Sequence, residues 1–417
     1  MINVELSNIW GCVSLPDLLG WERDIFDAHL KLRSNQPDEP GFLSWLGQSD
    51  AITARTVHAI HAAADSIAAC ADTLVVIGST NACRAAEAGL ALLAGQREAR
   101  MRVLFAGRDL SADRHLKLCD ALQNREYCLL LAFENRWQME NSIASRSVRW
   151  MMERKYGMQA KKRIYLCAPV DSSMAAAAEE EGHTFLPVPG ENGAACSALT
   201  SAMLLPMAVC GIDPIGILEG AAAAYEEYDL RAFENPVWMY VGARCALSQL
   251  GKRTELLGCT EPVFGLFGKW WQQSTLSGAG SLQPVWCPLP EELPRMQALI
   301  DGRLEGFATL LHIPPVCAQK IGVEMDWKDR DGLGYLDGRS MQEVAKAFVQ
   351  ALGLAHEASG APQIVLECDS ISTQVFGELL YFFELANALC AQIAGPAASE
   401  SQSVRELLPQ VLGSPEL

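Results

Sequence analysis

Short apolar runs alternate with longer amphipathic segments through the first half of the chain. Each run has five or six residues and is rich in Leu, Ile and Val, as expected for strands that are covered on both faces. The amphipathic segments 81–95 and 142–157 are long enough to cross between parallel strands. The pattern therefore predicts a layered α/β unit, with strands at 73–78, 101–106, 127–132 and 163–167.

The second half of the chain begins with helical patterning and then returns to the same alternation. Residues 197–250 read as helices that are interrupted near Gly211 and at Asn235-Pro236. Residues 373–394 form a helix that is hydrophobic all round, which predicts burial between domains or subunits, and a short helix is predicted at 404–412. The strand-like runs in this half are 254–258, 307–312 and 363–367.

These patterns predict the α/β class, with two three-layer α/β/α domains, mostly parallel sheets and a C-terminal helical tail. Four segments are expected. They are an N-terminal helical segment that packs on the body (1–50), a first α/β domain (51–195), a helical connection with a second α/β domain (196–394) and a tail helix (395–417).

Composition and charge narrow the classes of partner. The formal net charge of −17 speaks against nucleic acid and anionic membrane surfaces, so any phosphate group would need local donors. The N-terminus lacks a signal-peptide pattern and no stretch approaches the ~20 apolar residues of a membrane span, so we expect a cytoplasmic protein. The 14 cysteines form no Cys-x-x-Cys pair, which predicts free thiols and no metal site.

The segment 264–280 carries the most specific motif of the chain. It reads Phe-Gly-Leu-Phe-Gly-Lys-Trp-Trp-Gln-Gln-Ser-Thr-Leu-Ser-Gly-Ala-Gly and resembles the segment E-W-W-K-Q-L-x-G-E-S-x-G-K of bacterial glucose-6-phosphate isomerases. Other matches follow in the family's order, so the resemblance covers nearly the whole chain. They include 42–47, 142–165, 199–211, 331–336, 354–356, 376–384 and 412–415.

The resemblance implies a fold, an assembly and a reaction. The family has two sugar-isomerase (SIS) domains and is usually a dimer whose active sites lie at the subunit interface. It interconverts glucose 6-phosphate and fructose 6-phosphate through ring opening and a cis-enediol, and it uses no cofactor. This chemistry needs a base for the carbon-bound proton, an acid/base that opens the ring, and donors that hold the phosphate and the developing oxyanion.

The family's catalytic groups fall on residues that cannot perform these tasks, so no catalytic residue is retained. The glutamate base falls on Ser277, and the ring-opening histidine falls on Leu293 or Pro294. The family's lysine falls on Leu408 and its arginine on Ala195. The expected site is therefore a hexose-phosphate cleft without its proton shuttle.

The phosphate-binding loop is also changed. The family's S-K-S-G-T-T-T-E corresponds to residues 133–140, Phe-Glu-Asn-Arg-Trp-Gln-Met-Glu, where Trp137 and Met139 would obstruct the approach of backbone N–H groups to an anion. Arg136 either pairs with a phosphate or pairs with Glu134 or Glu140 at the surface.

Four positions remain as candidate substrate contacts. Gly78 and Ser79 end the turn that contacts the sugar in the family, Gln273 matches a substrate-contacting glutamine, and Ser277 carries a hydroxyl. Two of them also have a structural interpretation. Ser277 fits a turn cap, and Gln273 fits a surface position beside Trp270 and Trp271, which we expect to anchor the core. His312 and His356 are expected to be structural.

Three functions stay open from the residues. The first is a catalytically impaired or inactive homologue that binds a sugar phosphate or has a regulatory role, which explains all the losses at once. The second is an active isomerase of glycolysis and gluconeogenesis that uses Glu140, Glu291 or Glu357 as a substitute base. The third is a structural dimer without a ligand. In each case a homodimer is expected from the resemblance.

Overall fold

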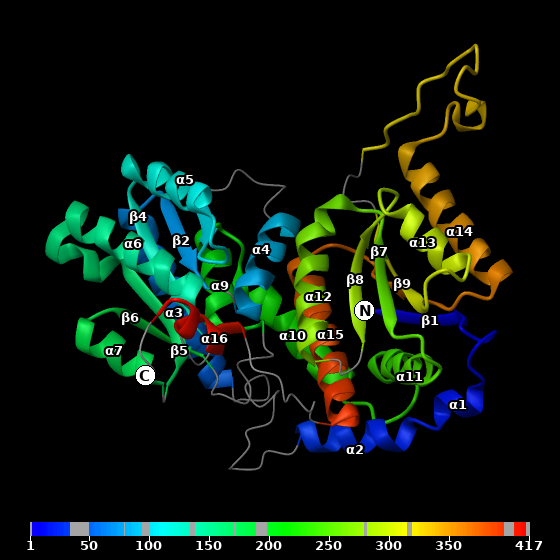
Figure 1. Cartoon of the computed structure of the whole chain (residues 1–417), viewed down its shortest axis with the longest axis horizontal. Helices are drawn as coiled ribbons and strands as arrows, with labels where there is room; N and C mark the ends of the chain where they lie inside the picture. The colour runs from blue at the N-terminus through cyan, green and yellow to red at the C-terminus, as the bar shows by residue number, and fades with distance from the viewer. Residues whose placement is uncertain are drawn as a thin grey trace.

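The chain folds around two five-stranded sheets that lie side by side, each with helices on both faces (Figure 1). The structure is a computed structural model. It describes residues 2–33, 50–78, 80–93, 101–133, 138–170, 172–188, 198–278, 282–314, 319–395 and 404–413.

The first sheet is entirely parallel, with the strand order β3-β2-β4-β5-β6. Its central strands are buried along their whole length, which explains why they read as continuous apolar runs. The strands are β2 (Thr73–Ile77), β3 (Arg102–Ala106), β4 (Tyr127–Ala132), β5 (Ile164–Pro169) and β6 (Thr184–Val188).

Alternate residues of these strands face two different helical layers. Leu74 and Val76 belong to the core shared with α3, α4 and α9, whereas Val75 and Ile77 pack with α5, α6 and α7. The helices of this half are α3 (Asp50–Cys70), α4 (Asn81–Leu93), α5 (Ala112–Gln123), α6 (Met139–Tyr156), η2 (Gly157–Arg163), α7 (Ser173–Glu181) and α9 (Ser201–Val209).

The second sheet has the order β1-β10-β9-β7-β8 and is parallel except for β1. Its strands are β1 (Asn3–Asn8), β7 (Thr254–Cys259), β8 (Gln283–Pro288), β9 (Gly306–His312) and β10 (Gln363–Glu367). The remaining helices are α1 (Leu15–Leu19), α2 (Glu22–Arg33), α10 (Pro214–Glu227), α11 (Pro236–Gln249), η3 (Pro262–Phe264), α12 (Gly265–Gly278), α13 (Leu293–Ile300), η4 (Gly334–Leu336), α14 (Met341–Ser359), α15 (Thr373–Ala394) and α16 (Val404–Val411).

The α/β class with mostly parallel sheets is confirmed, and the expectation of a purely helical segment over 1–50 is corrected. Residues 3–8 form β1, which pairs antiparallel with β10 in the second sheet. Val4 and Leu6 are buried while Asn3 and Glu5 are exposed, so this short stretch has the period of two that a half-buried edge strand requires. Helices α1 and α2 follow it.

Helix α15 occupies a central position and is buried as its composition predicts. It packs against α2, α10, α11 and α12, and it also contacts α4 of the first half. The contact with α10 is close, because a Cβ atom on Gly220 would lie 1.9 Å from the carbonyl oxygen of Gln374. Small residues therefore set this helix crossing, and α15 links the two halves.

Candidate functional site

Two of the predicted sugar-contacting residues, Gly78 and Gln273, lie where α4 and α12 pack together across the two halves. Gly78 follows β2 and leads into α4, and Gln273 lies on α12, which contacts α4. Ser79 lies outside the described residues. Ser277 is in the described helical backbone of α12, but its side chain lies outside the described part. The candidate site is thus built where the carboxyl edge of the first sheet meets the second half.

A close approach of two strand ends explains the glycine at position 78. A Cβ atom there would lie 2.4 Å from the carbonyl oxygen of Ala132 and 3.0 Å from Sγ of Cys83. Any larger residue would push β2 away from β4 or move the start of α4. Thr80 then caps the start of α4, because its hydroxyl accepts a 3.1 Å hydrogen bond from the backbone N–H of Cys83.

Helix α12 is anchored through its tryptophans, as the sequence predicts. Trp270 and Trp271 are fully buried, with Trp270 beside Phe267 (5.1 Å between ring centroids) and Trp271 beside Phe383 of α15 (6.4 Å). Gln273 is half-buried on the same helix. The tryptophans therefore anchor α12 in the core, and Gln273 lies on the same helix, two residues after Trp271.

The positions onto which the resemblance places the family's catalytic groups hold no titratable side chain where the structure describes them. Leu293 and Pro294 begin α13, and Leu408 is half-buried in α16. Ala195 and the loop residues 134–137, which include Arg136 and Trp137, lie outside the described residues. Leu293, Pro294 and Leu408 therefore offer no acid or base at the described positions.

The two histidines singled out in the sequence have structural surroundings. His312 ends β9, and its Nδ1 atom lies 3.6 Å from Oε1 of Glu367 at the end of the neighbouring strand β10. His356 is fully buried, and its Nδ1 atom lies 3.3 Å from the carbonyl oxygen of Ala361. Burial lowers the pKa of His356, so it is neutral at physiological pH.

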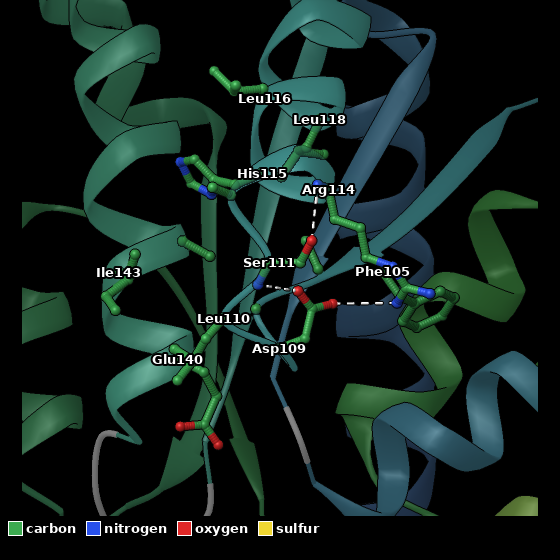
Figure 2. A pocket seen from close by; sticks show the side chains of 14 residues that line it. Phe105, Asp109, Leu110, Ser111, Arg114, His115, Leu116, Leu118, Glu140 and Ile143 are labelled. Atoms are coloured by element: carbon green, nitrogen blue, oxygen red, sulfur yellow. Dashed lines mark hydrogen bonds and ion pairs between the residues drawn. The ribbon is translucent and has the colours of Figure 1, made fainter. Parts of the chain in front are cut away.

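A cavity of about 500 Å³ opens at the carboxyl end of β3, between α5 and α6 (Figure 2). Asp109 lies in it, where its carboxylate accepts hydrogen bonds from the backbone N–H of Ser111 (2.8 Å) and from Arg114 (3.2 Å). Glu140 also lines this cavity, whereas Glu291 and Glu357 are exposed at the surface. Most of the remaining lining is apolar, from Phe105, Leu110, Leu116, Leu118 and Ile143.

A buried carboxyl group that the sequence pattern did not reveal joins the two halves beside the candidate site. Glu384 of α15 accepts a 3.0 Å hydrogen bond from the side-chain amide of Asn81, and its carboxyl also accepts the backbone N–H of Ala198. Burial raises the pKa of Glu384 well above its ordinary value, against the lowering effect of these two hydrogen bonds. Burial therefore favours the neutral, protonated form of this carboxyl group.

Two arginines that sequence reasoning missed lie at the same sheet edge. Arg108 is in the loop after β3, and its Nε atom donates a 3.0 Å hydrogen bond to the carbonyl oxygen of Gly78. Arg84 lies on α4, one turn after the helix start. The signal available in the sequence was the place of Arg108, two residues beyond an apolar strand, because side chains at the carboxyl ends of parallel strands converge on ligand sites.

The described part of the chain has neither a metal-binding cluster nor a helix that could span a membrane. It contains no group of three or more His, Cys, Asp or Glu side chains placed to hold a metal ion. None of its helices combines the length and the apolar composition needed to cross a membrane.

Comparisons with known proteins agree with the sequence motifs. The chain is 31% identical over 389 residues to the glucose-6-phosphate isomerase of Symbiobacterium thermophilum, in a match that covers 88% of this chain and 85% of that protein. It is 30% identical over 372 residues to the glucose-6-phosphate isomerase of Bacillus cytotoxicus, with 85% and 82% covered. No protein-family model matches the chain.

Solved structures share the fold over the whole chain. A hypothetical protein from Thermus thermophilus has a TM-score of 0.82 at 18% identity, with 99% of both chains covered. A glucose-6-phosphate isomerase from Chlamydia trachomatis has a TM-score of 0.78 at 13% identity, with 99% of this chain and 88% of that chain covered. The extent of the sequence identity, together with the motif order, shows that the chain belongs to the glucose-6-phosphate isomerase family.

Proposed function

We propose that this chain binds a sugar phosphate and isomerises it poorly or not at all, as a catalytically impaired or inactive member of its family with a binding or regulatory role. The observation that carries the proposal is the contrast within α12, where both tryptophan anchors are buried in the core while the position of the family's glutamate base holds Ser277. Loss of a positioned base typically costs about 100- to 10,000-fold in rate.

The other replaced positions support the same proposal. Leu293, Pro294 and Leu408 cannot exchange a proton at physiological pH, and Ala195 carries no charge where the family has an arginine. Ring opening and oxyanion stabilisation would each lack a group, in addition to the missing base. A single substitution elsewhere would not compensate for losses in three separate roles.

A second candidate function is an active isomerase with a substitute base, and one observation favours it. Glu140 lines the cavity between α5 and α6 together with His115, so a carboxylate and an imidazole share one hollow (Figure 2). The exposed positions of Glu291 and Glu357 give this alternative no support. It ranks second because Gly78 and Gln273, the retained contacts, are not among the residues that line this cavity.

We also propose that the protein is a cytoplasmic homodimer that needs no cofactor. The arm, defined as residues 319–340, projects from the second half before α14 (Figure 1). Trp327 on this arm is 95% exposed, Tyr335 is 68% exposed and Met325 is 67% exposed. Large apolar side chains concentrated on a projecting segment are typical of a surface that a partner covers, and a second copy of the chain fits the family's habit.

The proposed function is tested by turnover and by binding, measured on the same preparation. A coupled assay with fructose 6-phosphate at high enzyme concentration should give a rate well below about 1 per second, an ordinary enzyme rate. Isothermal titration with glucose 6-phosphate should show saturable binding that glucose alone does not give. Turnover at an ordinary rate, lost in Glu140→Gln, would instead establish the second candidate function.

A further inference from the structure

Two arginines and one glutamate of the described residues lie beside the predicted sugar-contacting turn, at the carboxyl edge of the first sheet. Arg84 and Glu87 lie on α4, and Arg108 lies in the loop after β3. Arg108 forms an ion pair with Glu87, and Arg84 lies near both groups. Burial raises the pKa of the nearby Glu384 carboxyl and so favours its neutral form, and Asp109 pairs with Arg114. Among the described residues, this leaves the charge of Arg84 without an ion-pair partner.

Arg108 is held in one orientation by three different contacts. Its Nε atom donates to the carbonyl oxygen of Gly78 at 3.0 Å, its Nη1 atom pairs with Glu87, and its guanidinium carbon lies 5.3 Å from the ring centroid of Phe105. Its remaining nitrogen, Nη2, is buried and has no hydrogen-bond partner within the described residues. A fixed guanidinium with an unused N–H group is prepared to bind an acceptor.

Arg84 lacks the partners that a half-buried arginine normally has. Its Nε atom is buried without a hydrogen bond, and the described part of the chain offers its guanidinium no ion pair within 4.0 Å. Burial is the larger cause that lowers the pKa of Arg84, and the positive charge of Arg108 is the second. The negative charge of Glu87 offsets this lowering only in part. Burying an unpaired donor beside a like charge is unfavourable, and an anion bound here would relieve both costs.

We propose that Arg84 and Arg108 together bind the phosphate group of a phosphate monoester at the carboxyl ends of β2 and β3. Two guanidinium groups with unused N–H donors match the charge and the multiple acceptor oxygens of such a group, and they can bind it through several hydrogen bonds at once. The place beside Gly78 keeps the phosphate close to the retained sugar-contacting turn. The inference rests on the proposed function, because it names the residues that take over from the altered loop at 133–140.

The decisive variant is Arg84→Gln, because the Arg84 guanidinium makes no hydrogen bond to the described residues that its removal could break. We expect the Kd for glucose 6-phosphate, measured by isothermal titration, to rise at least about tenfold, the effect of one charge-assisted hydrogen bond. Arg84→Lys, which keeps the charge, should recover part of the affinity. Arg102→Gln is the matched control, since Arg102 lies at the opposite end of β3 and should leave the Kd unchanged.

A second variant tests the role of the shared carboxylate. Glu87→Gln removes the charge that competes with the ligand for Arg108, so we expect tighter binding of both glucose 6-phosphate and inorganic phosphate. A purely structural ion pair predicts the opposite, with lower thermal stability and no gain in affinity. Unchanged Kd values in both Arg84→Gln and Glu87→Gln would overturn the inference.

Two ligands separate this inference from the proposed function. Inorganic phosphate could bind the wild-type chain but not Arg84→Gln, while glucose 6-phosphate binds the wild-type chain no more tightly than phosphate does. In that case the anion site is supported and the proposed sugar-phosphate function is wrong. If glucose 6-phosphate binds equally well to wild type and Arg84→Gln, the anion site fails and the proposed function stands. If neither ligand binds the wild-type chain, both fail.

Discussion

The side-chain amide of Asn81, the first residue of α4, donates a 3.0 Å hydrogen bond to the buried carboxyl group of Glu384 on α15. The two residues are 303 positions apart and belong to different halves of the molecule. The same carboxyl also accepts the backbone N–H of Ala198, just before α9. One buried side chain therefore holds the start of the helix that follows the predicted sugar-contacting turn.

Replacing Glu384 by glutamine should reduce the dependence of stability on pH. Burial raises the folded-state pKa of Glu384 well above its ordinary value of 4.5, so the unfolded chain releases this proton at lower pH than the native protein does. Its contribution is fully present below about pH 4.5 and is lost as pH rises toward the folded-state pKa. We expect Glu384→Gln to unfold at a higher temperature than wild type at about pH 8, with the gap narrowing toward about pH 5.

Glutamine suits this test because its amide oxygen still accepts from Asn81 and Ala198. Glu384→Leu is the control, since it removes the acceptor of the Asn81 amide and leaves the buried N–H of Ala198 unsatisfied, at a cost of about 1–3 kcal/mol for that donor. Thermal unfolding followed by circular dichroism over the pH range measures both variants. A wild-type stability that rises between about pH 5 and about pH 8 relative to Glu384→Gln would contradict a protonated carboxyl.

Most of the fold follows from the sequence pattern, and two missed strands share one cause. Helix α15 has the predicted bounds, and β4 and β10 coincide with predicted runs. Strands β6 and β8 were missed, because Pro187 in the first and Pro284 in the second argue against a strand. Both strands lie at a sheet edge, where proline is tolerated because one side of the strand needs no ladder hydrogen bonds.

The candidate site was less predictable than the fold. Gly78 and Gln273 could be singled out only through the family resemblance. Helix α4, which begins after Gly78, packs against α12, which carries Gln273. Arg84, Arg108 and Glu384 gain their meaning from neighbours that are distant along the chain, such as the carbonyl oxygen of Gly78 for Arg108. No local pattern encodes such contacts, because they depend on how the sheets and helices pack.

A buried ion pair lies in the second half, and breaking it on one side should be costly. Arg244 of α11 and Glu255 of β7 are both fully buried, and the Arg244 Nε atom donates to Glu255 at 3.0 Å. Glu255 also accepts the hydroxyl groups of Tyr240 (2.5 Å) and Thr309 (2.7 Å). We expect Arg244→Met to lower the free energy of unfolding by about 3–5 kcal/mol, since it leaves a carboxylate buried without its counter-charge.

The paired replacement provides the control for that prediction. Arg244→Met combined with Glu255→Leu removes both charges and should recover much of the lost stability, as measured by urea unfolding monitored through tryptophan fluorescence. The hydroxyl groups of Tyr240 and Thr309 lose their shared acceptor in the double variant, so recovery is expected to be incomplete. Equal stability of Arg244→Met and wild type would show that the pair contributes little.

Removing the most exposed aromatic side chain of the arm should weaken self-association. Trp327 is 95% exposed on the arm, where a second copy would cover it. We expect Trp327→Ser to raise the dimer dissociation constant at least about tenfold, because buried tryptophans dominate the energy of many interfaces. Sedimentation velocity over a range of protein concentrations measures this change.

Met158→Ser is the matched control for the arm. Met158 is 85% exposed in η2, in the first half of the molecule, so its removal should leave the dissociation constant unchanged. A wild-type chain that sediments as a monomer at every concentration would sink the dimer proposal. Dissociation by Met158→Ser together with an unaffected Trp327→Ser would place the interface on the first half instead.

Restoring the missing base alone should not restore isomerisation. Ser277→Glu places a carboxylate near the end of α12, where the resemblance places the family's base. The resemblance places the ring-opening group on Leu293 or Pro294 and the lysine on Leu408, and these residues remain unchanged. Groups that act in one mechanism are strongly non-additive, so one of them without its partners gives little rate. We expect the rate at which Ser277→Glu turns over fructose 6-phosphate to stay within a few-fold of the wild-type rate. The Kd for glucose 6-phosphate should rise, because the new carboxylate repels the phosphate dianion. A rate near about 1 per second in this single variant would mean that the cleft still contains the other groups the reaction needs.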